Sequence, residues 1–183
     1  MKKVNILLLI AILFITANLV KAADPGDDTA TCAISVTVNQ LIEWAGNFTA
    51  ITLTQIDAQA DAPEDDETQT LYVNCNIEIS ADNTATAQLS SATDTLVTKY
   101  KLADDGDGVA TTGATAADET TSGVATWTDY DSFLTTVLPM THVDTDGAVD
   151  ITLYVQATNN AGEMADAGAY SATQTVTASW TSD

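Results

Sequence analysis

Residues 70–80 alternate between apolar and polar side chains, apart from one tyrosine among the polar positions. The apolar row consists of Leu71, Val73, Cys75, Ile77 and Ile79. An alternation with a period of two is typical of a β-strand that buries one of its faces. The pattern therefore predicts a strand here, with a cysteine in its buried row.

Other segments show similar alternation or an enrichment in Thr and Val, and they predict further strands. These strands are expected over residues 31–42, 48–56, 84–90, 95–102, 148–157 and 169–180, with shorter ones in 124–127 and 132–140. Polar stretches at 57–69 and 103–123 are expected to be surface loops. No long helical period is present, so we predict an all-β fold, a β-sandwich of about eight strands in a single domain.

The first 23 residues have the layout of a secretory signal peptide. Two lysines precede an apolar run from Ile6 to Ile15, and small residues follow around Ala22. The run is short for a membrane-spanning helix, which needs about 20 residues. We therefore expect cleavage after Ala22 or Ala23, a single domain over residues 24–183, and no membrane span in the secreted chain.

Secretion changes what the two cysteines are expected to do. Cys32 lies in the predicted strand 31–42, on the same row as Ile34, Val36 and Val38. Disulfides form and persist outside the cytoplasm, and Cys32 is the sole intramolecular partner available to Cys75. We predict a Cys32–Cys75 disulfide. The alternatives are two buried thiols or an intermolecular bridge.

The charge of the secreted chain excludes one class of partner. All 26 acidic residues follow the signal peptide, whereas only Lys99 and Lys101 carry positive charge there, which gives a formal charge of −24. Nucleic-acid binding requires clustered cations against phosphate, and this chain has none. Surface acidity of this kind favours solubility or association with divalent cations.

Enzymatic activity has little support in the sequence. The one histidine, His142, is expected in a surface loop, and no nucleophile-elbow sequence accompanies it. We therefore expect a protein that is not an enzyme.

Two Asp- and Gly-rich stretches favour calcium binding over catalysis as the chemical role of this chain. The candidate ligands are Asp104, Asp105, Asp107, Asp144, Asp146 and Asp150. Closely spaced carboxylates on a flexible loop suit Ca²⁺, which takes six to eight oxygen ligands. The alternative is that both stretches are solvated Asp/Gly turns.

The chain resembles the chaperone–usher pilins and the spore-coat-U-type proteins, which are secreted Ig-like β-sandwiches. The resemblance rests on a signal peptide before Cys32, a second cysteine within LYVNC, and a terminal segment, AGAYSATQTVTASW, that alternates after a glycine. It implies bridged cysteines, a periplasmic chaperone that grips Gly168 to Trp180, and assembly through an usher. Unlike those pilins, this chain has only about nine residues, acidic and turn-like, between the cleavage site and Cys32, so strand donation would fall to Thr31–Val38 itself.

These features predict a structural subunit of an extracellular, cell-surface filament or pilus that polymerises with itself by β-strand addition. The residues expected to carry assembly lie in the two terminal strands and are Ile34, Val36, Val38, Tyr170, Val176 and Trp180. The alternative function is a monomeric cell-surface binding module for calcium or for a glycan.

Overall fold

The structure is a computed structural model that describes residues 29–104, 109–111, 116–118, 126–142 and 147–182. The chain divides into two units, Met1–Val38 and Asn39–Asp183. Each unit is described by itself. The predicted signal peptide lies outside the described residues. Within the described part of the chain, no helix is both long and apolar enough to cross a membrane.

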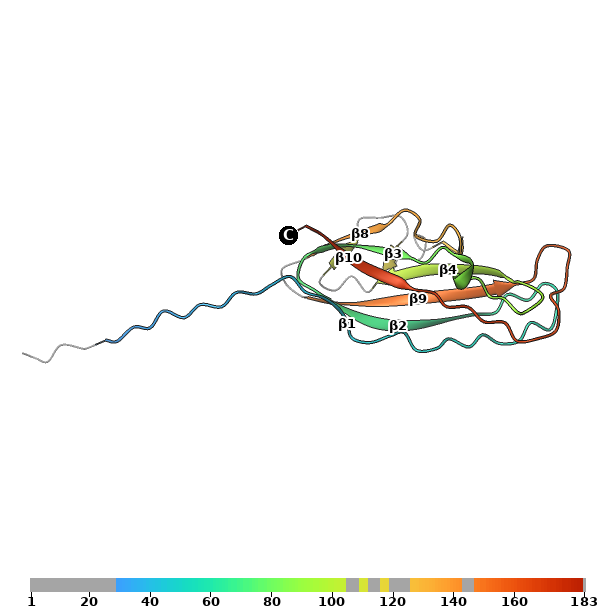
Figure 1. The fold of residues 1–183 in the computed structure, drawn as a ribbon, viewed down its shortest axis with the longest axis horizontal. Helices are drawn as coiled ribbons and strands as arrows, with labels where there is room; N and C mark the ends of the chain where they lie inside the picture. The colour runs from blue at the N-terminus through green and yellow to red at the C-terminus, as the bar shows by residue number, and fades with distance from the viewer. Residues whose placement is uncertain (1–28, 105–108, 112–115, 119–125, 143–146, 183) are drawn as a thin grey trace, which may run out of the picture. The chain divides into compact units, whose positions relative to one another are not determined.

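The second unit contains a larger sheet of six strands (Figure 1). Its order is β1 (Ile42–Trp44), β2 (Glu64–Val73), β9 (Ala148–Thr158), β4 (Val97–Asp104) and β6 (Ala116–Asp118), and β7 (Thr128–Asp129) also pairs with β4. β4 and β6 are parallel, and the other pairs in this sheet are antiparallel. β2 and β9 pair from Glu64 opposite Gln156 to Tyr72 opposite Ala148; β9 carries an alternating apolar row, whereas β2 is apolar only over its last three residues.

The smaller sheet has four antiparallel strands. They are β10 (Val176–Ser182), β3 (Asn76–Ala81), β8 (Leu138–His142) and β5 (Val109–Thr111), in this order. A short 3-10 helix, η1 (Ala85–Ala87), follows β3 and is capped by the hydroxyl of Thr84, which accepts a hydrogen bond from the Thr86 amide. The chain crosses from the larger to the smaller sheet at the turn between β2 and β3.

The apolar rows of both sheets meet in one core. The larger sheet supplies Leu71, Val73, Tyr100, Leu102, Val149, Ile151, Leu153 and Val155, and the smaller sheet supplies Ile77, Ile79, Leu138 and Met140. This arrangement confirms the all-β prediction and agrees with a β-sandwich. The predicted strands 70–80 and 148–157 correspond to β2–β3 and β9, and Cys75 is 2 % exposed, as its position in the buried row predicts.

Three predicted strands were wrong in whole or in part. Residues 31–41 are not in a strand, and the pairing begins at Ile42, opposite Val73. Residues 48–56 are outside any strand. Residues 84–90 contain η1, because the Thr84 cap starts a helical turn, and Ser90 makes two isolated bridges, to Thr95 and to Ser171.

The two expected loops also contain strands. Residues 64–69 belong to β2, because the acidic side chains of an edge-proximal strand can point to solvent while its backbone pairs with β9. The region 103–123 includes β5 and β6 in its described part. A search for alternating apolar residues misses such short, polar strands.

Candidate functional site

An open groove of about 810 Å³ lies over part of the core. Residues 48–57 line it on one side, and residues 164–168, 170 and 172–174 line it on the other. Its floor consists of Leu89, Leu96, Tyr100, Leu153, Val155 and Ala157. Leu89 is half-buried, Leu96 is buried just before β4, and the other floor residues come from β4 and β9 of the larger sheet, so the groove lies over the edge of the main core.

Residues 48–57, here called the first wall, run in an extended path but pair with no strand. Phe48, Ile51 and Leu53 are half-buried and pack against the core. Hydrogen bonds hold the two ends of the wall: the Gln69 side chain donates to the Asn47 carbonyl at 2.8 Å, and the Asp57 amide donates to Asp61 at 2.8 Å. The backbone between these ends belongs to no sheet ladder, which is the condition for accepting a further strand.

Residues 164–174, here called the second wall, are paired along one edge only. Ser171 exchanges both of its backbone hydrogen bonds with Ser90, at 3.0 and 3.1 Å, and the Thr173 amide donates to the Thr86 carbonyl at 2.8 Å. In an extended chain the backbone groups of successive residues point to opposite sides. The backbone groups of Tyr170 and Ala172 therefore point away from Ser90 and Thr86, and both residues line the groove.

Asn159 joins the two walls at one end of the groove. It is only 7 % exposed. Its amide nitrogen donates to the Ala58 and Gln59 carbonyls, both at 3.3 Å, and its side-chain oxygen accepts from the Ala165 amide at 3.0 Å. Because one side chain satisfies groups of the turn that follows the first wall and of the second wall, it ties this end of the first wall to the second. The alternation of apolar residues gave no signal for Asn159.

Tyr100 lies in the floor and is 3 % exposed. Its hydroxyl donates to the Ala87 carbonyl at 2.7 Å. Burial, with the nearby negative charge of Asp82, raises the pKa of Tyr100 to about 12. The Tyr100 hydroxyl is therefore uncharged over the ordinary range of pH.

The segment from Thr29 to Val38 is described in the first unit, where it has no regular structure. Its apolar row is almost fully exposed: Ile34 is 91 %, Val36 is 86 % and Val38 is 77 % exposed. Such a row of large apolar side chains is costly to leave in water. The sequence predicted the row correctly but placed it in the core of its own chain.

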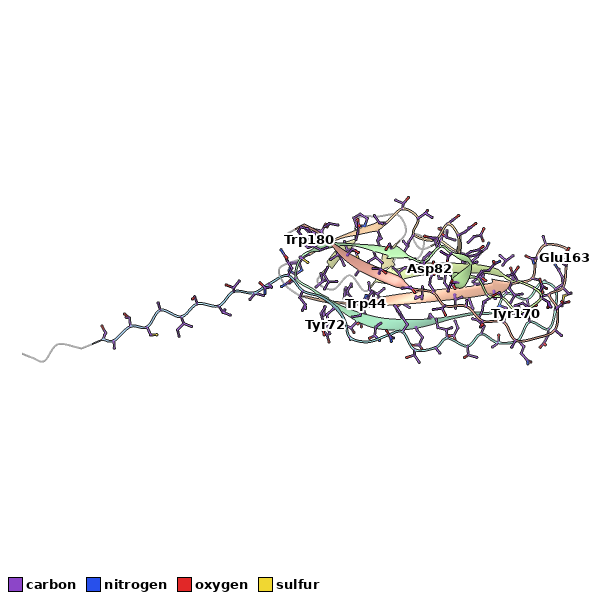
Figure 2. The ribbon with its side chains drawn as sticks, viewed as in Figure 1. Trp44, Tyr72, Asp82, Glu163, Tyr170 and Trp180 are labelled. Atoms are coloured by element: carbon purple, nitrogen blue, oxygen red, sulfur yellow. The ribbon has the colours of Figure 1, made fainter. Side chains whose placement is uncertain are left out.

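The C-terminal candidates are distributed between the groove and the smaller sheet. Tyr170 lines the groove. Val176 begins β10 and pairs with Ala81. Trp180, expected to face inward, is 54 % exposed, and this expectation was wrong (Figure 2). The register of β10 against β3 shifts just after Trp180, where the strand reaches the end of its partner.

The two cysteines differ in their surroundings. Cys75 is buried and its thiol lies 3.8 Å from the Leu41 carbonyl oxygen. Cys32 is exposed, so its expected place in a buried row was wrong for this structure. No disulfide joins the described residues. The predicted Cys32–Cys75 bridge stays a prediction.

The calcium candidates are only partly covered by the structure. Asp105, Asp107, Asp144 and Asp146 lie outside the described residues, as does the side chain of Asp104. Asp150 is exposed on β9 and accepts a hydrogen bond from the Thr70 hydroxyl at 2.6 Å. The described residues contain no group of three or more potential metal ligands.

The expectation that His142 lies in a surface loop was wrong, because His142 is the last residue of β8. Its amide donates to the Asn76 side chain at 3.0 Å, because this end of β8 pairs next to the start of β3. The side chain is half-buried, and its neighbour in sequence, Asp144, lies outside the described residues.

No protein-family model matches the chain, and no curated protein matches it.

Proposed function

We propose that this protein is a secreted structural subunit of an extracellular filament, and that subunits join by β-strand addition. The observation that carries the proposal is the presence, in one chain, of an open groove over the core and of an exposed apolar row on an unpaired segment. The segment from Thr31 to Val38, here called the donor segment, enters the groove of a second copy. An extended segment added between two edges gains backbone hydrogen bonds and buries alternate side chains.

The two partners match in chemistry. The donor row of Ile34, Val36 and Val38 is apolar, and the floor it would cover is made mostly of Leu, Val, Ala and Tyr side chains. Each branched side chain that moves from water into such a floor contributes about 1.5–3 kcal/mol. The donor segment also carries no charged residue, which matters because burying an unpaired charge is costly.

The two partners also match in length. The eight residues of the donor segment span about 25 Å when extended, at roughly 3.3 Å per residue. The ten residues of the first wall span about 30 Å at the same rise. A strand of this length can therefore pair along most of the wall and cover the floor.

The C-terminal segment takes the acceptor role in this proposal. Tyr170 and Ala172 belong to the second wall, and β10 is paired with β3 within its own chain. The donor is therefore the N-terminal segment alone. An Ig-like pilin relationship, with a periplasmic chaperone and an usher, agrees with this division of roles and is part of the proposal.

Electron microscopy of the purified secreted protein tests the proposal. Fibres with a repeat of one subunit are expected at high protein concentration. A synthetic peptide of residues 29–39 should occupy the groove and stop fibre growth, whereas the same peptide with Val36 replaced by Asp should not. A compact monomer at all concentrations would contradict the proposal and favour the alternative, a monomeric module that binds calcium or a glycan.

A further inference from the structure

Strand donation by the segment ending at Val38 leaves no linker between the donated strand and the rest of its subunit. Asn39 is the first residue of the second unit. Its carbonyl accepts a hydrogen bond from the Asn74 side chain at 3.0 Å, and the Leu41 amide donates to the same side chain at 2.7 Å. The chain is therefore anchored to the turn between β2 and β3 immediately after the last donor residue.

Two large apolar side chains are exposed around this turn. Leu41 is 44 % exposed and is held there by Asn74. Trp180 is 54 % exposed and pairs with Ile77, three residues beyond Asn74. Figure 2 shows Trp180 at the same end of the sandwich as Trp44, which belongs to the strand that Leu41 precedes. We call Leu41 and Trp180 the end patch.

We infer that the end patch packs against the next subunit of the filament, at the rim of the groove that holds the donor segment. This inference rests on the proposed function. With Val38 inside the neighbour's groove and Asn39 fixed to Asn74, the bodies of the two subunits must touch, because a single peptide unit spans only about 3.8 Å. The end patch surrounds the point of connection, so it is the surface that the contact buries.

The contact has a mechanical consequence. Two bodies joined by one strand and a flexible linker would rotate freely about it, whereas bodies that also share an apolar contact hold one orientation. Exposed aromatic residues are the side chains that most often anchor such contacts. The filament therefore resists bending. This resistance comes from the end-patch contact, whereas the donor segment supplies the strand that joins the subunits.

Tryptophan fluorescence and electron microscopy together test this inference on the secreted full chain. On assembly of the wild type, emission should shift to shorter wavelength as Trp180 leaves water, and Trp180→Phe should lose most of that shift. Trp180→Ser and Leu41→Ser should still form filaments but with a persistence length reduced several-fold. Val137→Ser is the matched control, because Val137 is 38 % exposed but lies before β8, outside the end patch.

The outcomes separate the two proposals. Wild-type filaments whose emission does not shift, or Trp180→Ser filaments as stiff as the wild type, would overturn the end-patch contact and leave strand donation in place. A wild type that never forms filaments would overturn both. A wild type whose emission does not shift overturns the contact without any variant, and Trp180→Phe assigns an observed shift to Trp180 rather than to Trp44 or Trp127.

Discussion

The Tyr100 hydroxyl donates a 2.7 Å hydrogen bond to the backbone carbonyl of Ala87, which ties the floor of the groove to the helical turn beside it. Replacing Tyr100 with Phe keeps the ring but leaves the carbonyl without this donor. We expect the free energy of unfolding to fall by about 1 kcal/mol at neutral pH. Urea unfolding measures the change, and Tyr72→Phe at an exposed position should stay within about 0.5 kcal/mol of the wild type.

The same residue predicts a loss of stability at high pH. An unfolded tyrosine ionises near pH 10, whereas burial raises the pKa of Tyr100 to about 12 in the folded protein. The folded state therefore holds the proton more tightly, and its contribution is fully present below about pH 10. It is lost as the pH rises from about 10 to 12, by up to about 2–3 kcal/mol. Tyr100→Phe should remove this component, and an identical pH profile for the two proteins would contradict it.

Asn159 should be more important for stability than its neighbour Asn160. Asn159 satisfies backbone groups of the turn after the first wall and of the second wall, whereas the Asn160 side chain makes one hydrogen bond, to the Thr95 carbonyl at 3.1 Å. We expect Asn159→Ala to cost about 2–3 kcal/mol and Asn160→Ala about 1 kcal/mol. Thermal unfolding of both variants checks the order, and equal losses would mean that Asn159 does not hold the walls.

The predicted disulfide has a direct test in the unreduced secreted protein. A Cys32–Cys75 bridge predicts one linked peptide pair in mass spectrometry and no thiol that reacts with an alkylating reagent. The arrangement in the structure differs, because Cys32 is exposed and would react in the native protein, while Cys75 would react only after unfolding. Alkylated Cys32 in the native secreted protein would contradict the bridge.

The calcium hypothesis predicts a ligand-dependent gain in thermal stability. An ion that binds only the folded state raises the melting temperature in proportion to the logarithm of its concentration. We expect millimolar Ca²⁺ to raise Tm, and Asp146→Ala to remove the rise. Asp150→Asn tests whether the carboxylate that accepts from Thr70 takes part. No shift in the wild type would leave these residues as solvated turns.

The sequence predicted best the strands that have one apolar face and one polar face. The alternation over residues 148–157 coincides almost residue for residue with β9, and Cys75 is buried as its row requires. The same rule failed for residues 31–41, whose row is equally regular but exposed. Alternation shows that a strand buries one face, but it cannot show whether the covering partner belongs to the same chain.

The groove could not be predicted from the sequence, for a related reason. Residues 48–56 were expected to form a strand because Ile51 and Leu53 alternate, and in the structure they keep the extended path without a partner. Asn159 gave no signal, because its role depends on two loops that meet only in three dimensions. Both failures concern long-range pairing, which local patterns do not encode.

The filament yield of two adjacent variants tests the central claim most directly. Val36→Asp puts a charge in the donor row, and Thr37→Asp puts the same charge one residue along, on the opposite face. Val36 is 86 % exposed, so both variants should fold like the wild type, which circular dichroism and thermal unfolding check. Sedimentation and electron microscopy at matched concentration should show no filaments for Val36→Asp and nearly wild-type yield for Thr37→Asp. Equal yields from the two folded variants would contradict strand donation by this segment.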